Sequence, residues 1–171
     1  MHTALSSALF FDILLVLAAL GSALIAGVFF AFSGFVMGAL ARIAPEQGIA
    51  AMQSINVVVL RSWFIPVFAG TAVICVALGA WVLLDWPAHG STAGAAMLAG
   101  CALYAIGTFG GTIAFNVPLN DLLARQDAHT EAARAVWVRY LRDWTRWNHL
   151  RTVTATLAAA LFLLVAMRPA A

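Results

Sequence analysis

One short stretch of the chain gathers the side chains that are best suited to act on a substrate. Asn148, His149 and Arg151 lie within four residues, between an aromatic segment with Trp144 and Trp147 and the last long apolar run. A histidine titrates near neutral pH and can act as a general base, and a buried arginine can stabilise an anion. We therefore expect His149, Arg151 and Asn148 to be catalytic, with Trp144 and Trp147 contacting the substrate.

A second polar group surrounds a proline at the end of the third apolar run. Pro118 lacks a backbone N–H donor and is expected to break or kink a helix. Asn116 and Asn120 flank it, and Asp121 follows directly. These side chains could hydrogen-bond the freed backbone groups, or they could present two amides and a carboxylate to a ligand. Together with Asn56, from an earlier segment, they are the candidate substrate-binding residues.

The same residues also have purely structural interpretations. Thr145, Thr152 and Thr156 share a helical face with His149 and could satisfy its ring nitrogens. Arg151 could be a topology anchor or a contact to lipid phosphate. Polar groups inside a membrane are costly unless they are partnered or used. The sequence therefore leaves the catalytic and the structural hypotheses open side by side.

The elements that position these residues are strongly apolar. Of the 171 residues, 64% are hydrophobic and only 9% are charged, whereas average soluble domains carry roughly a quarter charged residues. Four stretches approach the ~20 apolar residues that a membrane-spanning helix needs. We predict an all-α integral membrane protein with a single domain over residues 1–171, built as a four-helix bundle. The predicted spans are residues 10–37, 64–84, 93–117 and 150–167.

The two longer connections, residues 38–63 and 118–149, are predicted to form amphipathic interfacial helices. In the second, Trp137, Leu141 and Trp144 recur at helical spacing, and arginines occupy the other faces. Tryptophan and arginine together are typical of the lipid headgroup boundary. We expect this helix to lie along the membrane face before it turns into the fourth span.

Glycines in two of the spans predict close helix contacts, because small residues let helix backbones approach each other in lipid. Each set has the same seven-and-four spacing. The glycines are Gly27, Gly34 and Gly38 in the first span and Gly100, Gly107 and Gly111 in the third.

The distribution of basic residues predicts the orientation in the membrane. All nine are arginines, and eight of them fall in or beside the first and third connections. By the positive-inside rule, both connections lie in the cytoplasm and both termini lie outside. We expect the chain to reside in a bacterial inner (cytoplasmic) membrane.

Several kinds of site lack their sequence signature. No two histidines are three or four residues apart, and there is no Cys-x-x-Cys or Glu-x-x-His motif, so no metal site within one chain is predicted. The arginines fit a membrane belt, and no nucleic acid partner is expected. The sequence leaves open a homo-oligomer and a metal or other cofactor shared between chains.

The layout resembles the DUF1772 family of small four-span membrane proteins, which includes the anthrone oxygenases. The resemblance covers most of the chain and rests on three motifs. These are Phe32-Ser33-Gly34, Asn116-x-Pro118-x-Asn120, and Trp144-x-x-Trp147-Asn148-His149-x-Arg151-Thr152. It implies oxidation of a polycyclic phenolic anthrone to a quinone by dioxygen, with a cofactor-independent reaction as one alternative.

Residues and resemblance together predict a membrane-embedded, anthrone oxygenase-like protein. An apolar aromatic substrate would enter from the membrane and lose a proton to His149. Arg151 and the asparagine amides would stabilise the resulting anion, which could react with dioxygen directly. The alternative is a non-catalytic partner subunit or small-solute carrier, in which the polar cluster only holds the bundle together. The expected partners are membrane lipid and a hydrophobic small molecule; the cofactor is unknown.

Overall fold

The computed structural model describes residues 2–84 and 92–168, with side chains from residue 9 onward. Within these ranges the regular elements are all helices. Four of the helical stretches are long and apolar enough to cross a membrane, which confirms the predicted all-α class and its four spans. These stretches are Leu9–Leu40, Phe64–Leu84, Thr92–Ala124 and Glu131–Ala166.

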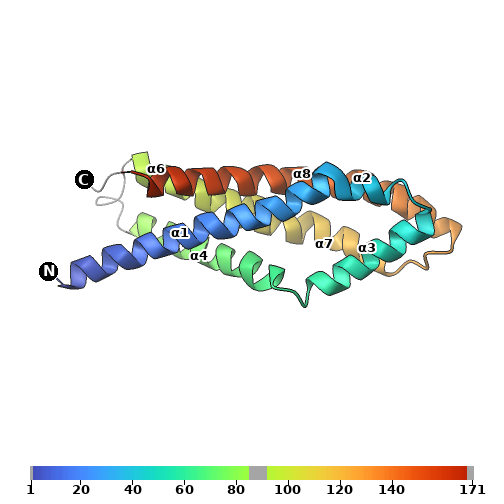
Figure 1. Cartoon of the computed structure of the whole chain (residues 1–171), viewed down its shortest axis with the longest axis horizontal. Helices are drawn as coiled ribbons and strands as arrows, with labels where there is room; N and C mark the ends of the chain where they lie inside the picture. Colours follow the sequence, from blue (N-terminus) through green and yellow to red (C-terminus); the bar gives the residue numbers. More distant parts are fainter. Residues whose placement is uncertain (1, 85–91, 169–171) are drawn as a thin grey trace.

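The four spans surround one apolar core. Helix α1 (His2–Ala31) contacts both α4 (Phe64–Leu84) and α8 (Glu131–Ala166), and α6 (Thr92–Ala102) contacts the same two helices. Both described ends of the chain lie at one end of this bundle, and the two longer connections lie at the other (Figure 1). Large side chains from all four helices fill the centre, including Ile25, Leu78, Tyr104 and Phe162, together with the free cysteines Cys75 and Cys101.

The first and third spans contain π-helical turns, in which backbone hydrogen bonds run from residue i to i+5. The first span continues from α1 through η1 (Phe32–Val36) into α2 (Met37–Leu40). The third continues from α6 through two π segments into a final α-helix. These are η2 (Leu103–Gly110), η3 (Thr112–Asn116) and α7 (Val117–Ala124). Such turns are frequent at functional sites, and here η3 contains the candidate residue Asn116.

The expected break at Pro118 is absent. Asn116 and Val117 both keep right-handed helical backbone angles, and Pro118 lies in the first turn of α7. A proline ring normally collides with the carbonyl group four residues earlier. The π turn η3 directly before α7 shifts the backbone pairing by one residue, which explains how the helix continues through the proline.

The predicted turn between the second connection and the fourth span is wrong. Residues Glu131–Ala166 form one continuous α-helix of 36 residues. Neither glycine nor proline interrupts this sequence, so the change from charged to apolar composition alters the surroundings of the helix and not its path. Helix α3 (Pro45–Val59) and the first half of α8 extend the bundle (Figure 1). An interfacial position for them stays a prediction.

A second apolar cluster closes this extended end of the bundle. It joins α2, α3, α7 and the first half of α8 through buried side chains. These are Met37, Ile49, Met52, Leu123, Ala133, Trp137, Tyr140 and Trp144. The cluster positions α3 beside α8, and α3 carries Asn56.

Only two of the six glycines make the predicted close contacts. A Cβ atom added to Gly100 would lie 2.8 Å from Cε1 of Phe162, and one added to Gly107 would lie 2.7 Å from Cγ2 of Thr154. Both contacts are with α8. The other four glycines have no such neighbour within 4 Å.

Candidate functional site

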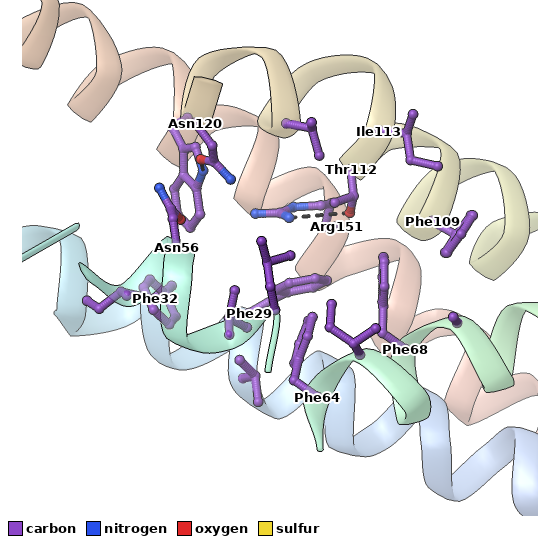
Figure 2. A pocket seen from close by; sticks show the side chains of 18 of the residues that line it. Phe29, Phe32, Asn56, Phe64, Phe68, Phe109, Thr112, Ile113, Asn120 and Arg151 are labelled. Carbon is purple, nitrogen blue, oxygen red and sulfur yellow. Dashed lines mark hydrogen bonds between the residues drawn. The ribbon is translucent and has the colours of Figure 1, made fainter. Parts of the chain in front are cut away.

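A cavity of about 330 Å³ lies where α1, η1, α3, α4, η2, η3, α7 and α8 converge. Its walls are mainly apolar. Five phenylalanines contribute to them, namely Phe29, Phe32, Phe64, Phe68 and Phe109. The polar lining residues are Asn56, Thr112, Asn120 and Arg151, together with the amphipathic Trp144. Figure 2 shows Asn56 and Asn120 to one side of Arg151, and Phe64, Phe68 and Phe109 to the other.

Arg151 supplies the only charge on the described walls of this cavity, and it is 4% exposed. Its Nη2 donates to Oδ1 of Asn148 at 2.7 Å, its Nη1 donates to Oγ1 of Thr112 at 3.3 Å, and its Nε has no partner. The guanidinium carbon lies 4.2 Å from the ring centroid of Phe29 and 5.0 Å from that of Trp144. In the described part of the chain, no carboxylate pairs with it. Burial of a charge without a counter-ion is costly, so this site favours an anionic ligand.

Asn148 holds Arg151 in place and does not itself line the cavity. Its Nδ2 donates to the backbone oxygen of Phe29 and to Oγ of Ser33, both at 2.7 Å. A carbonyl oxygen can only accept and a guanidinium can only donate, so the orientation of the Asn148 amide is fixed. The side chain is buried and its amide is fully engaged. The geometry therefore gives Asn148 a positioning role.

The orientation of the Asn120 amide is fixed by the same argument, and only its oxygen takes part in the hydrogen bonds. Its Oδ1 accepts from the hydroxyl group of Tyr140 and from Nε1 of Trp144, both at 2.8 Å. Because the indole N–H can only donate, the atom facing it must be the amide oxygen. The Nδ2 of Asn120 is thus left to donate to a ligand. The side chain of Asn56 interacts with Tyr140 and lies on the same side of the cavity as Asn120 (Figure 2). Its Nδ2 is buried and has no hydrogen-bond partner, so it is a further donor of the lining.

Two other expected binding residues lie close to this site but outside the cavity walls. Asn116 is buried, and its Nδ2 donates to the backbone oxygen of Trp144 at 3.2 Å, while its Oδ1 has no partner. Trp147 stacks on Phe115 with a centroid distance of 3.7 Å and an interplanar angle of 4°. Asn116 therefore supports the backbone of α8, and Trp147 joins α8 to η3.

His149 and Asp121 are not brought to the cavity. Both residues are exposed, and neither lines its walls. Asn148 and Arg151 are three residues apart and share one face of α8, whereas His149 is rotated by about 100° from Asn148. The base role of His149 and the binding role of Asp121 stay predictions, and the geometry offers them no support.

The sequence interpretation missed Thr112 and the wall of phenylalanines. Thr112, Asn116 and Asn120 recur every four residues, so their spacing could have indicated Thr112 as a member of the same face. Phe64 and Phe68 are also four apart, and their rings stack at 5.4 Å. Without a structure, such a pair cannot be told from ordinary core residues.

The rim of the cavity is apolar. Leu60 from the connection between α3 and α4, Ile113 from η3 and Val117 from α7 all line the cavity, and all three are exposed on the surface of the bundle. The connection between α3 and α4, which carries Leu60, lies at the side of the bundle, partway along its length (Figure 1). An apolar ligand could therefore reach Arg151 sideways, from the membrane.

No metal cluster is evident at this site. Among the residues that the structure describes, no three histidine, cysteine, aspartate or glutamate side chains are grouped so that they could hold an ion. The polar lining residues Arg151, Asn56 and Asn120 themselves offer hydrogen-bond donation, and Arg151 adds charge stabilisation.

Fold and site together define a four-span membrane protein with an aromatic cavity and a buried, unpaired cation. The model of the anthrone oxygenase family matches residues 60–161, more than half of the chain, and the protein belongs to this family. The matched region contains the Asn116–Asn120 and Trp144–Thr152 motifs, and Phe32-Ser33-Gly34 precedes it. No curated protein and no solved structure matches the chain.

Proposed function

We propose that this protein oxidises an apolar, polycyclic phenolic compound of the anthrone type to a quinone with dioxygen, through a substrate anion. The observation that carries the proposal is Arg151, a buried cation without a carboxylate partner that faces a cavity walled by phenylalanines. Membership of the anthrone oxygenase family supports the substrate class.

The cavity suits a planar aromatic ligand. At about 330 Å³ it lies at the lower end of the ~300–1,000 Å³ range of small-molecule sites, which are mostly apolar with a few polar groups that fix orientation. The rings of Phe64 and Phe68 offer flat surfaces, and Phe109 packs against Phe68 at 5.0 Å. A ligand ring could stack there with its oxygen directed toward Arg151.

The reaction uses the anion that this site would stabilise. An anthrone loses a C–H proton and becomes an enolate, whose negative oxygen accepts hydrogen bonds from Arg151 and from the amides of Asn56 and Asn120. The electron-rich ring carbon gives an electron to dioxygen and then forms a C–O bond. Protonation yields a hydroperoxide, which loses water to form the second carbonyl group. One anthrone and one dioxygen thus give one anthraquinone and one water.

Oxygen uptake tests this proposal directly. The purified protein, reconstituted in nanodiscs with its metal content measured and chelatable metal removed, is given an anthrone. We expect oxygen consumption and the absorbance of the quinone to rise together above the protein-free rate. Quinone formation that requires restored metal would contradict a cofactor-independent reaction, and none above background would favour a carrier or partner subunit.

Two variants of α8 localise the activity. Arg151→Gln should lower turnover by ~10²–10³-fold, the usual effect of removing one donor to a transition-state oxyanion. Arg146→Gln is the matched control, because Arg146 is an exposed arginine of the same helix, and it should retain wild-type turnover. Equal rates in the two variants would remove Arg151 from the mechanism.

A further inference from the structure

The described walls of the cavity contain no side chain that could accept a proton. Arg151 is their only charged residue. The lining residues of α1 and α4 are apolar, α3 adds the amide of Asn56, η3 adds the hydroxyl group of Thr112, and α7 adds the amide of Asn120. None of these groups is a base near neutral pH.

Four ionisable residues outside the lining also do not supply a base for the ligand proton. Tyr140 of α8 is buried, and its hydroxyl group donates to Oδ1 of Asn120, so it is held in its protonated form. Arg61 follows the rim residue Leu60 and is exposed, but a guanidinium is already protonated. The exposed His149 and Asp121 do not line the cavity.

Three of the unused polar atoms around the cavity are hydrogen-bond donors. Nε of Arg151 and Nδ2 of Asn56 have no partner, and Asn120 retains its Nδ2. The hydroxyl group of Thr112 is engaged on both sides, because it accepts from Arg151 and donates to the backbone oxygen of Thr108 at 2.7 Å. A neutral phenol can accept from these donors but leaves the charge of Arg151 uncompensated, whereas an oxyanion both accepts from the donors and neutralises Arg151.

We propose that the cavity selects its aromatic ligand as the oxyanion, and that the ligand proton passes to water and not to a side chain. On binding, one O–H or C–H bond of the ligand breaks, its electron pair stays on the ligand, and the proton enters the medium. This inference rests on the proposed function for the aromatic character of the ligand. It adds that the ligand is already the anion when it binds, before any reaction with dioxygen, and that solvent and not a protein base takes the proton.

An oxygen-inert dye tests the inference without turnover. The probe is 2-hydroxyanthraquinone, a planar tricycle whose phenolate absorbs at longer wavelength than its neutral form. The protein is held in nanodiscs of uncharged phosphatidylcholine, and the bound dye is titrated by its visible spectrum. We expect the bound dye to ionise at least about one pH unit below the same dye in empty nanodiscs, which corresponds to about a tenfold preference for the anion.

Variants assign the shift to Arg151. Arg151→Gln should return the ionisation of the dye to that in empty nanodiscs or to higher pH, Arg151→Lys should keep part of the shift, and Arg146→Gln should keep all of it. The wild-type titration stands alone if Arg151→Gln does not fold. An unshifted or upward-shifted wild-type dye, or no saturable binding, would overturn the inference.

Proton release provides a second measurement. Calorimetric titration with the dye in two buffers of different ionisation enthalpy, at a pH midway between the ionisation of the bound and of the free dye, should show net proton release, about half a proton per dye bound for a shift of one pH unit. Release near zero would show that the neutral form binds or that the protein keeps the proton. A shifted dye without anthrone turnover would reject the oxygenase and retain the anion site, and turnover without a shift would do the reverse.

Discussion

Asn148 accepts a hydrogen bond from Arg151 at 2.7 Å through its Oδ1, and its Nδ2 reaches across to α1. The guanidinium of α8 is therefore positioned by the first helix as well as by its own. This amide connects Arg151 to the backbone oxygen of Phe29 and the hydroxyl group of Ser33. The amide of Asn148 is fully engaged in this network, whereas Nε of Arg151 is left without a partner.

Asn148→Asp should disable the anion site while leaving Arg151 in the protein. The new carboxylate would lie against the guanidinium and neutralise it, so the bound dye should ionise at the same pH as in empty nanodiscs. Anthrone turnover should fall at least about tenfold. The visible titration and the oxygen electrode measure the two effects on the same sample.

The matched control at this position is Asn148→Ala, which removes the three side-chain hydrogen bonds but adds no charge. It should lower the free energy of unfolding by about 1–3 kcal/mol, since buried polar groups lose their partner, and should retain part of the dye shift. If Asn148→Asp loses less of the shift in dye ionisation than Asn148→Ala does, the charge at Arg151 is not what this position controls.

Asn120 should separate stability from binding. Asn120→Ala leaves the hydroxyl group of Tyr140 and the N–H of Trp144 without their acceptor, so we expect a lower melting temperature and a cost of about 1–3 kcal/mol. Asn120→Asp keeps an acceptor for both donors and should melt close to the wild type, yet bind the dye anion more weakly. Thermal unfolding in detergent and dye binding test the pair, and equal melting temperatures would contradict the assigned amide orientation.

His149→Ala distinguishes the sequence interpretation from the geometry. A general base would lose most of its turnover on this substitution, whereas an exposed residue outside the cavity should leave turnover within about twofold and the melting temperature unchanged. We expect the second result, because His149 does not line the cavity. A large loss of activity in a variant that folds normally would restore it as the base.

Gly107→Ala should weaken the contact between η2 and α8. The added Cβ would lie 2.7 Å from Cγ2 of Thr154, and overpacking of this kind costs about 1–3 kcal/mol. Thr154→Ser removes that methyl group and should restore part of the loss in the double variant. Gly27→Ala is the control, because nothing lies within 4 Å of its added Cβ. A melting temperature that falls equally in both would contradict the packing.

The sequence predicted the spans and the helical class because the length and apolarity of a run are enough to recognise a membrane helix. The continuous path of α8 was not predicted. A change from charged to apolar residues indicates that the surroundings of a helix change, and it does not indicate a bend. The π turns were also unforeseen. They accompany tertiary contacts, such as the hydrogen bond from Asn148 to the backbone of Phe29 just before η1, that a single sequence does not display.

On α8, the candidates found at the site are those that share one helical face. Trp144 and Arg151 line it, and Asn148 lies on the same side of α8, at spacings of four and three. His149 was selected for its chemistry alone, and helix geometry directs it elsewhere. The phenylalanine wall required the tertiary structure, because its members come from α1, η1, α4 and η2.

The exposed apolar rim formed by Leu60, Ile113 and Val117 has a consequence for how kinetics on this protein must be expressed. A ligand that enters sideways is drawn from the bilayer, so its effective concentration is its mole fraction in lipid and not its molarity in the buffer. An apparent KM measured in detergent should therefore rise as more detergent is added at constant substrate and protein. Rates plotted against surface concentration should fall on a single curve.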